Sequence, residues 1–154
     1  MAPLIVMVVA WFGLRAMGAA GVLSSADSWT SALRFALAIM FLFTAISHFH
    51  PRTRRELIQM VPPRLPSPSF LVAVTGALEI AGAIGLLIPK LVAAAAYGLI
   101  ALLVALFPAN VYAAQRGLMI AGRRATPLVW RLPLQLFWIG ALWWIASESP
   151  WWRR

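Results

Sequence analysis

The stretch Phe70–Pro89 is an apolar run of membrane length that carries a single charge, Glu79, near its middle. At about 1.5 Å per residue, a helix of about 20 residues spans roughly 30 Å, which matches the hydrocarbon core of a bilayer. A carboxyl group at that depth is costly when it faces lipid, so we expect Glu79 to face protein or a cavity. Its helical face is rich in small residues, as an interior helix face requires: Val72, Thr75, Gly76, Gly82, Ala83 and Leu86.

Two interpretations of Glu79 stay open at this point. It is either a protonated, hydrogen-bonded structural residue or part of a site for a ligand, a proton or a quinone. Ionisable residues inside membranes are often functional, so the two interpretations carry about equal weight.

Further apolar runs of similar length divide the rest of the chain: Ala2–Val22, Trp29–Phe49, Leu91–Gln115 and Pro127–Ser147. Of the 154 residues, 62% are hydrophobic and only 11% are charged, too few polar residues to cover the surface of a soluble domain. We therefore predict an all-α, polytopic membrane helix bundle. Its expected parts are an N-terminal transmembrane helix and linker (1–28), a four-helix membrane core (29–147) and a Trp/Arg-rich tail (148–154).

The first run, Ala2–Val22, has no basic residue before its apolar stretch, and Arg15 comes late in it. A cleaved signal peptide has the opposite arrangement, so we expect a retained transmembrane helix. Between the second and third runs, Arg52–Val61 has the amphipathic pattern of a short helix lying in the membrane interface. Its cationic side chains are candidates to bind lipid phosphates, although a role in setting topology is the simpler explanation: Arg52, Arg54 and Arg55.

The net charge of +9 comes from arginines that lie mainly between the apolar runs. This placement indicates that the positive charge serves to orient the protein in the membrane and to contact anionic lipids, and not to bind nucleic acid. Arginines are more frequent in the second and fourth connections, which predicts a cytoplasmic N-terminus and an outside C-terminus. The chain has no cysteine, which excludes disulfides, dithiol redox chemistry and thiolate metal ligation by this chain alone.

Each of the last four runs contributes a conspicuous polar side chain at a similar depth: His48, Glu79, Asn110 and Gln135. Arg131 lies one helical turn from Gln135. The coincidence predicts a shared polar cavity in the cytoplasmic half of the bundle; the alternative is a network of interhelical hydrogen bonds. A metal site is not expected, because His48 and His50 do not share a helical face.

These segments together resemble the DoxX-like family of membrane proteins, from Arg34 to about Ala146. The resemblance is carried by Phe41–Pro51 (FLFTAISHFHP), Met60–Pro68 (MVPPRLPSP), Thr75–Lys90 (TGALEIAGAIGLLIPK), Gly98–Ala114 (GLIALLVALFPANVYAA) and Arg131–Gln135 (RLPLQ). It implies a four-helix core in a bacterial inner membrane, here preceded by one extra helix. Family positions that match are the site candidates His48, Glu79, Asn110 and Gln135.

Three functions follow as hypotheses. The resemblance implies a membrane subunit or accessory of a quinone-linked redox system, with a membrane oxidoreductase as partner and quinone as the one cofactor to consider. A lipid or small-hydrophobe binding protein or isomerase, with Glu79 and His48 as acid and base, is the second. A membrane assembly factor without chemistry is the third. The sequence leaves the oligomeric state open.

Overall fold

The computed structural model describes residues 2–120 and 122–148. In this part of the chain it has six α-helices, one 3₁₀ turn and one two-stranded hairpin. The elements in chain order are α1 (Ala2–Ala19), η1 (Ser24–Ala26), α2 (Trp29–Phe49), α3 (Pro51–Met60), α4 (Pro68–Leu87), α5 (Val92–Arg116), β1 (Met119–Ile120), β2 (Arg123–Arg124) and α6 (Leu128–Glu148). Of the predicted tail (148–154), Glu148 is the last residue of α6, and residues 149–154 lie outside the described residues.

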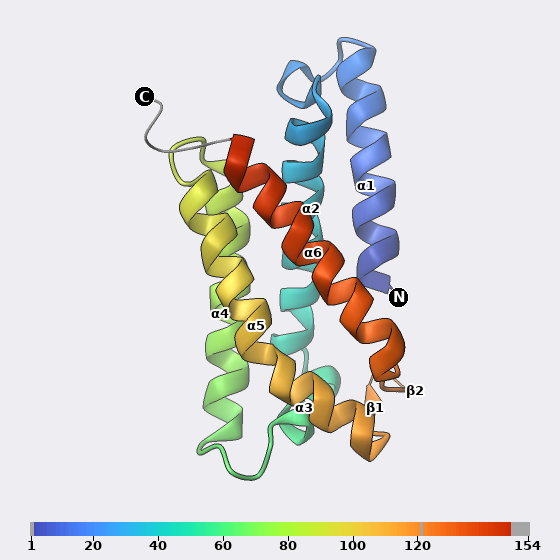
Figure 1. The fold of residues 1–154 in the computed structure, drawn as a ribbon, viewed down its shortest axis with the longest axis vertical. Helices are drawn as coiled ribbons and strands as arrows, with labels where there is room; N and C mark the ends of the chain where they lie inside the picture. Colours follow the sequence, from blue (N-terminus) through green and yellow to red (C-terminus); the bar gives the residue numbers. More distant parts are fainter. Residues whose placement is uncertain (1, 121, 149–154) are drawn as a thin grey trace.

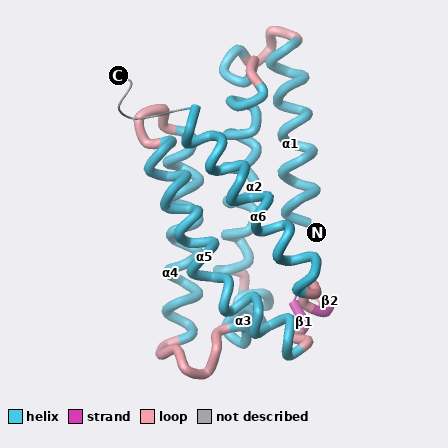
Figure 2. The backbone as a smooth tube through the Cα atoms, viewed as in Figure 1, coloured by secondary structure: helices cyan, strands magenta, loops and turns pink. Residues whose placement is uncertain are grey.

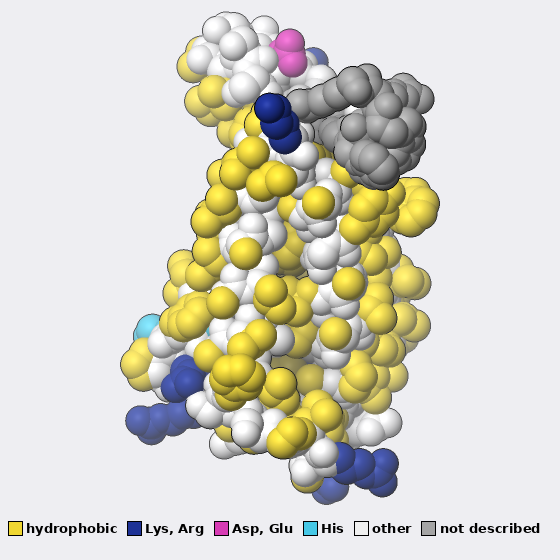
Figure 3. Space-filling view, turned by 90° about the vertical axis from the view of Figure 1, so that its left-hand side faces the viewer, with side chains coloured by type: hydrophobic (Ala, Val, Ile, Leu, Met, Phe, Trp, Pro, Cys, Tyr) yellow, Lys and Arg dark blue, Asp and Glu magenta, His cyan; other side chains and the backbone are white. Residues whose placement is uncertain are grey.

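Five of the described helices are long and apolar enough to cross a membrane: α1, α2, α4, α5 and α6. This confirms the prediction of a helical bundle of the multi-pass membrane class. Figure 3 shows one face of the molecule, where apolar side chains cover the middle and Lys and Arg gather toward the ends. Such a surface suits a protein surrounded by lipid, because apolar side chains are stable there without burial against protein.

The helices run up and down the bundle, with connections at its two ends (Figures 1 and 2). α2 packs mainly against α1 and α4, while α5 packs against α4 and α6. The turn around Pro89 and Lys90 makes α4 and α5 antiparallel neighbours, as the short connection predicts. The amphipathic α3 lies at the end of the bundle where α2 finishes and α4 begins.

The two halves of the bundle differ in packing. The closed half, toward the Pro89–Lys90 turn, contains fully buried side chains from α2, α4, α5 and α6: Leu33, Leu37, Leu86, Leu99, Leu142 and Ile145. Glycines let α4 and α5 approach closely there, since a Cβ on Gly82 would lie 2.5 Å from the Leu99 side chain. The open half, toward α3 and the hairpin, contains the predicted polar residues.

The connection between α5 and α6 holds the β1–β2 hairpin, an element that the sequence did not predict. Gly117 ends α5 in the left-handed conformation, and Gly122, with φ of 75°, lies between the two short strands. The backbone N–H of Ala125 donates to the carbonyl of Leu118 at 2.7 Å. Ala125 packs with Met60 of α3 and Ala113 of α5, so the hairpin joins the end of the open half to α3.

Candidate functional site

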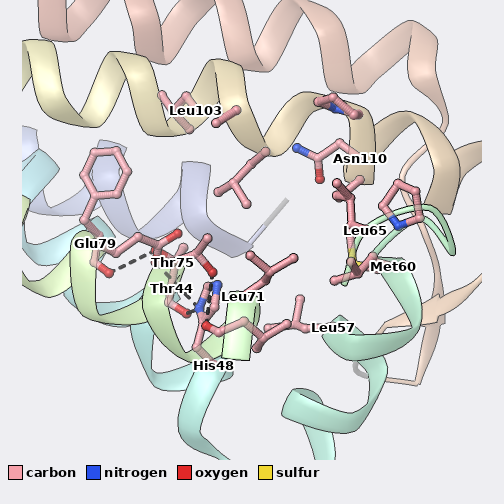
Figure 4. Close-up of a pocket in the computed structure, with 18 of the residues that line it drawn as sticks. Thr44, His48, Leu57, Met60, Leu65, Leu71, Thr75, Glu79, Leu103 and Asn110 are labelled. Atoms are coloured by element: carbon pink, nitrogen blue, oxygen red, sulfur yellow. Dashed lines mark hydrogen bonds and ion pairs between the residues drawn. The ribbon is translucent and has the colours of Figure 1, made fainter. Parts of the chain in front are cut away.

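A cavity of about 690 Å³ occupies the open half (Figure 4). Its walls come from α2, α4 and α5, with α3 and the α3–α4 connection at one end and single contributions from α1 and α6. Most of the lining is apolar. The polar side chains that reach it are Thr44, His48, Arg64, Thr75, Glu79 and Asn110. A large apolar pocket with a few convergent polar groups is the usual form of a small-molecule site.

Glu79 is held at the wall that α2 and α4 share. Its side chain is buried, with 6% of the residue exposed, and Thr44 Oγ1 donates to its Oε2 at 2.9 Å. Thr44 Oγ1 also lies 3.0 Å from the carbonyl oxygen of Phe41. A hydroxyl has one hydrogen and can also accept, so Thr44 can donate to an ionised Glu79, or accept from a protonated Glu79 while donating to Phe41.

His48 lies beside this carboxyl, one helical turn after Thr44. Its Nδ1 is 3.8 Å from Glu79 Oε2 and 3.4 Å from the carbonyl oxygen of Thr44. The ring packs against α4 at Gly76, where an added Cβ would lie 2.5 Å from His48 Cβ and 2.9 Å from His48 Cγ. Gly76 is therefore the residue that lets α2 and α4 approach closely enough to bring the histidine and the carboxyl together.

Two polar atoms of this wall have no partner among the residues that the structure describes, Glu79 Oε1 and His48 Nε2. Both side chains line the cavity. The wall can therefore exchange hydrogen bonds or protons with a bound molecule in mostly apolar surroundings.

The opposite wall carries Asn110, on α5. Arg131 Nη1 donates to Asn110 Oδ1, and Arg131 Nε donates to the carbonyl oxygen of Thr126 at 3.3 Å. Arg131 does not line the cavity; it fixes the amide that does. Gln135 also stands behind the wall, buried, with its Nε2 donating to the carbonyl oxygen of Leu103 at 3.0 Å.

The chain matches the model of a family described as a domain of unknown function, DUF8561, over residues 37–146. It belongs to the DUF8561 family. No curated protein and no solved structure matches it. The DUF8561 segment contains all the polar side chains that line the cavity, and α1 lies outside it.

Three of the five predicted pocket residues in the DUF8561 segment thus line one cavity: His48, Glu79 and Asn110. Gln135 and Arg131, by contrast, brace its α5 wall from α6. Pro108 explains why a brace is useful, because a proline within a helix removes a backbone donor and weakens the helix nearby. A proline at position 108 leaves the carbonyl of Val104 without its helical donor. The carbonyl that Gln135 binds is that of Leu103, one residue earlier.

Sequence reasoning did not include Thr44, Thr75 or Trp138 among the site candidates. A signal for the first two was present, since Thr44 precedes His48 and Thr75 precedes Glu79 by four residues, one turn on the same helical face. Trp138 lines the cavity from α6, and its buried indole N–H has no hydrogen-bond partner in the described part of the chain.

The basic residues of α3 differ from one another in their contacts. Arg54 Nη2 donates to Ser69 Oγ at 2.8 Å and so links α3 to the first turn of α4. Arg52 and Arg55 are exposed, which leaves them as the candidates for lipid phosphates. Among the described residues, no group of three or more His, Cys, Asp or Glu side chains is arranged to hold a metal ion.

Proposed function

We propose that this protein binds a quinone, or a closely similar oxygen-bearing ring molecule, in the cavity of the open half, as a membrane subunit or accessory of a redox system. The observation that carries the proposal is the cavity itself. It is large, about 690 Å³, mostly apolar, and has a histidine and a carboxyl on one wall and an amide on the other. A quinone needs this combination, because its ring is apolar and its oxygens form hydrogen bonds.

The resemblance to the DoxX-like family supports the redox part of the proposal, since that family includes membrane subunits of quinone-linked oxidation. Because the chain has no cysteine, it cannot supply electrons by thiol oxidation. We therefore place the electron donor on a partner, a membrane oxidoreductase. The DUF8561 chain would hold the quinone and exchange protons with it through Glu79 and His48.

The charge distribution supports a location in a bacterial inner membrane with the open half toward the cytoplasm. The arginines of α3 and of the α5–α6 connection lie at the open end, and basic residues are favoured on the cytoplasmic side. In this orientation the N-terminus is cytoplasmic and the C-terminus is outside. Basic side chains at that end would also contact the phosphates of anionic lipids.

A second candidate function is binding or isomerisation of a small apolar lipid. It is favoured by one observation, the 3.8 Å separation of His48 Nδ1 and Glu79 Oε2, which places two proton-exchanging groups together at the cavity. A third, an assembly factor without chemistry, would use the same contacts only to fix helix register.

Thermal unfolding of the purified protein in lipid nanodiscs tests the proposal. A short-chain ubiquinone, tested in its oxidised and in its reduced form, should raise the unfolding temperature, and Glu79→Gln or His48→Ala should lower the increase for at least one of the two forms. Glu148→Gln and His50→Ala are matched controls, because both residues are exposed and neither lines the cavity.

Absence of stabilisation by both ubiquinone and menaquinone analogues would contradict the quinone proposal. In that case, mass spectrometry of molecules extracted from the purified protein separates the other two functions. A defined apolar molecule that disappears in the Glu79→Gln variant would support lipid binding, and its absence would support the assembly factor.

A further inference from the structure

The two walls of the cavity offer opposite kinds of hydrogen-bonding groups. On the α5 wall, Arg131 fixes the orientation of the Asn110 amide. An arginine only donates, so the atom that it contacts must be the amide oxygen, and the NH₂ group is turned away from it. Figure 4 shows the Asn110 amide projecting from α5 toward the cavity. The group that it presents to a ligand is therefore a donor.

The α2–α4 wall has the opposite character. The carbonyl oxygen of Thr44 and the carboxyl of Glu79 lie beside His48 Nδ1, at 3.4 and 3.8 Å. Because a carbonyl only accepts, a neutral His48 carries its hydrogen on Nδ1, and Nε2 is an acceptor. Together with Glu79 Oε1, this wall favours a hydroxyl that donates.

We infer that the cavity selects the reduced, quinol form over the quinone. A quinol hydroxyl can donate to His48 Nε2 on the α2–α4 wall, while its second oxygen accepts from Asn110 on the α5 wall. A quinone has only acceptor oxygens. It can accept a hydrogen bond from Asn110, but it leaves His48 Nε2 without a hydrogen-bond donor. This inference rests on the proposed function, because it concerns which redox state of the same molecule is held.

Binding of the two redox states to the full-length protein in nanodiscs tests the inference. The probes are a short-chain ubiquinone and its two-electron-reduced quinol, measured under anaerobic conditions by quenching of tryptophan fluorescence or by calorimetry. We expect the quinol to bind about tenfold more tightly, the effect of roughly one additional satisfied hydrogen bond.

Two variants should then act differently on the two forms. Asn110→Asp keeps the partner of Arg131 but removes the NH₂ donor, so quinone affinity should fall about tenfold. Quinol affinity should fall less, because its hydroxyl can donate to the new carboxylate. His48→Ala should weaken the quinol about tenfold and leave the quinone nearly unchanged. Gln115→Glu is the matched amide-to-acid control, at an exposed position of α5 outside the cavity.

The outcomes distinguish the preference for the quinol from quinone binding itself. If quinone and quinol bind equally to the wild-type protein, or if Asn110→Asp and His48→Ala weaken both forms to the same extent, the inference is wrong while quinone binding stands. If neither form binds the wild-type protein, the proposed function itself is wrong.

Discussion

The closed and open halves of the bundle are built from the same helices but with different packing. In the closed half, leucines from α2, α4, α5 and α6 are fully buried, and glycines bring α4 against α5. In the open half, the same helices surround a mostly apolar cavity of about 690 Å³, and single polar contacts, Thr44 to Glu79 and Arg131 to Asn110, hold its walls. The comparison indicates that the two halves have different roles: the closed half stabilises the bundle, and the open half leaves room for a ligand.

The contrast also explains how the polar residues are tolerated. Glu79, His48 and Gln135 are buried, and each has a partner close by. A buried polar group without partners would be costly at membrane depth. Each wall of the open half is therefore held by its own small hydrogen-bonding group: Thr44 with Glu79 on one side, Arg131 with Asn110 on the other.

The largest difference between the halves should appear on truncation of a leucine. Leu142→Ala in the closed half removes a side chain with 0% exposure and should destabilise the protein by about 2–5 kcal/mol. Leu71→Ala in the open half enlarges a space that already exists, and should cost about 1 kcal/mol. Unfolding in mixed detergent micelles measures both. Equal losses would contradict the division between a packed and an open half.

Much of this arrangement could be predicted from the sequence, because apolar run length and helical periodicity depend on local residues. The second run, Trp29–Phe49, has the bounds of α2. The small face predicted around Glu79 is the face that packs, with Val72, Gly76, Ala83 and Leu86 buried. The similar depth of His48, Glu79 and Asn110 along their helices predicted a shared cavity, and all three line one.

The remaining features depend on contacts that no single helix specifies. Whether Gln135 faces the cavity or the backbone of α5 depends on how α5 and α6 pack, and helix depth says nothing about this. The same holds for Arg131, which was predicted as a pocket residue and is a brace for Asn110. The hairpin forms through Ala125, whose packing against Met60 of α3 is a long-range contact.

A glycine pair offers a sharper test of the open half. Gly76→Ala should destabilise the protein by about 1–3 kcal/mol, because the new methyl would lie 2.5 Å from His48 Cβ and push α2 from α4. The same change should weaken ligand binding, since it moves His48 from Glu79. Gly98→Ala is the control, an exposed helical position with nothing within 4 Å, and should leave both quantities unchanged or stabilise slightly.

The two measurements on Gly76→Ala need not change together. If stability falls while ligand binding is retained, the contact between α2 and α4 matters for packing only, and the His48–Glu79 wall does not bind the ligand.

A smaller effect is expected at the brace from α6. Gln135→Leu removes the donor to the Leu103 carbonyl, and should cost about 0.6 kcal/mol, the typical value for one hydrogen bond between transmembrane helices. Ligand affinity should change little, since Gln135 does not line the cavity. Reversible unfolding gives the first quantity and the fluorescence titration gives the second. A loss of affinity without a loss of stability would place Gln135 in the site and not behind its wall.

The smallest effects should come from the arginines of α3, and they separate structural roles from lipid contacts. Arg54→Gln removes the donor to Ser69, so we expect a loss of about 0.5–1 kcal/mol in stability with lipid retention unchanged. The double variant Arg52→Gln and Arg55→Gln removes two exposed charges. It should leave stability within about 0.5 kcal/mol and lower the number of anionic lipids retained in native mass spectrometry. If Arg54→Gln lowers lipid retention without a loss of stability, and the double variant lowers stability without a loss of lipid, then Arg54 is free to reach lipid and α3 is held at the open end by other contacts.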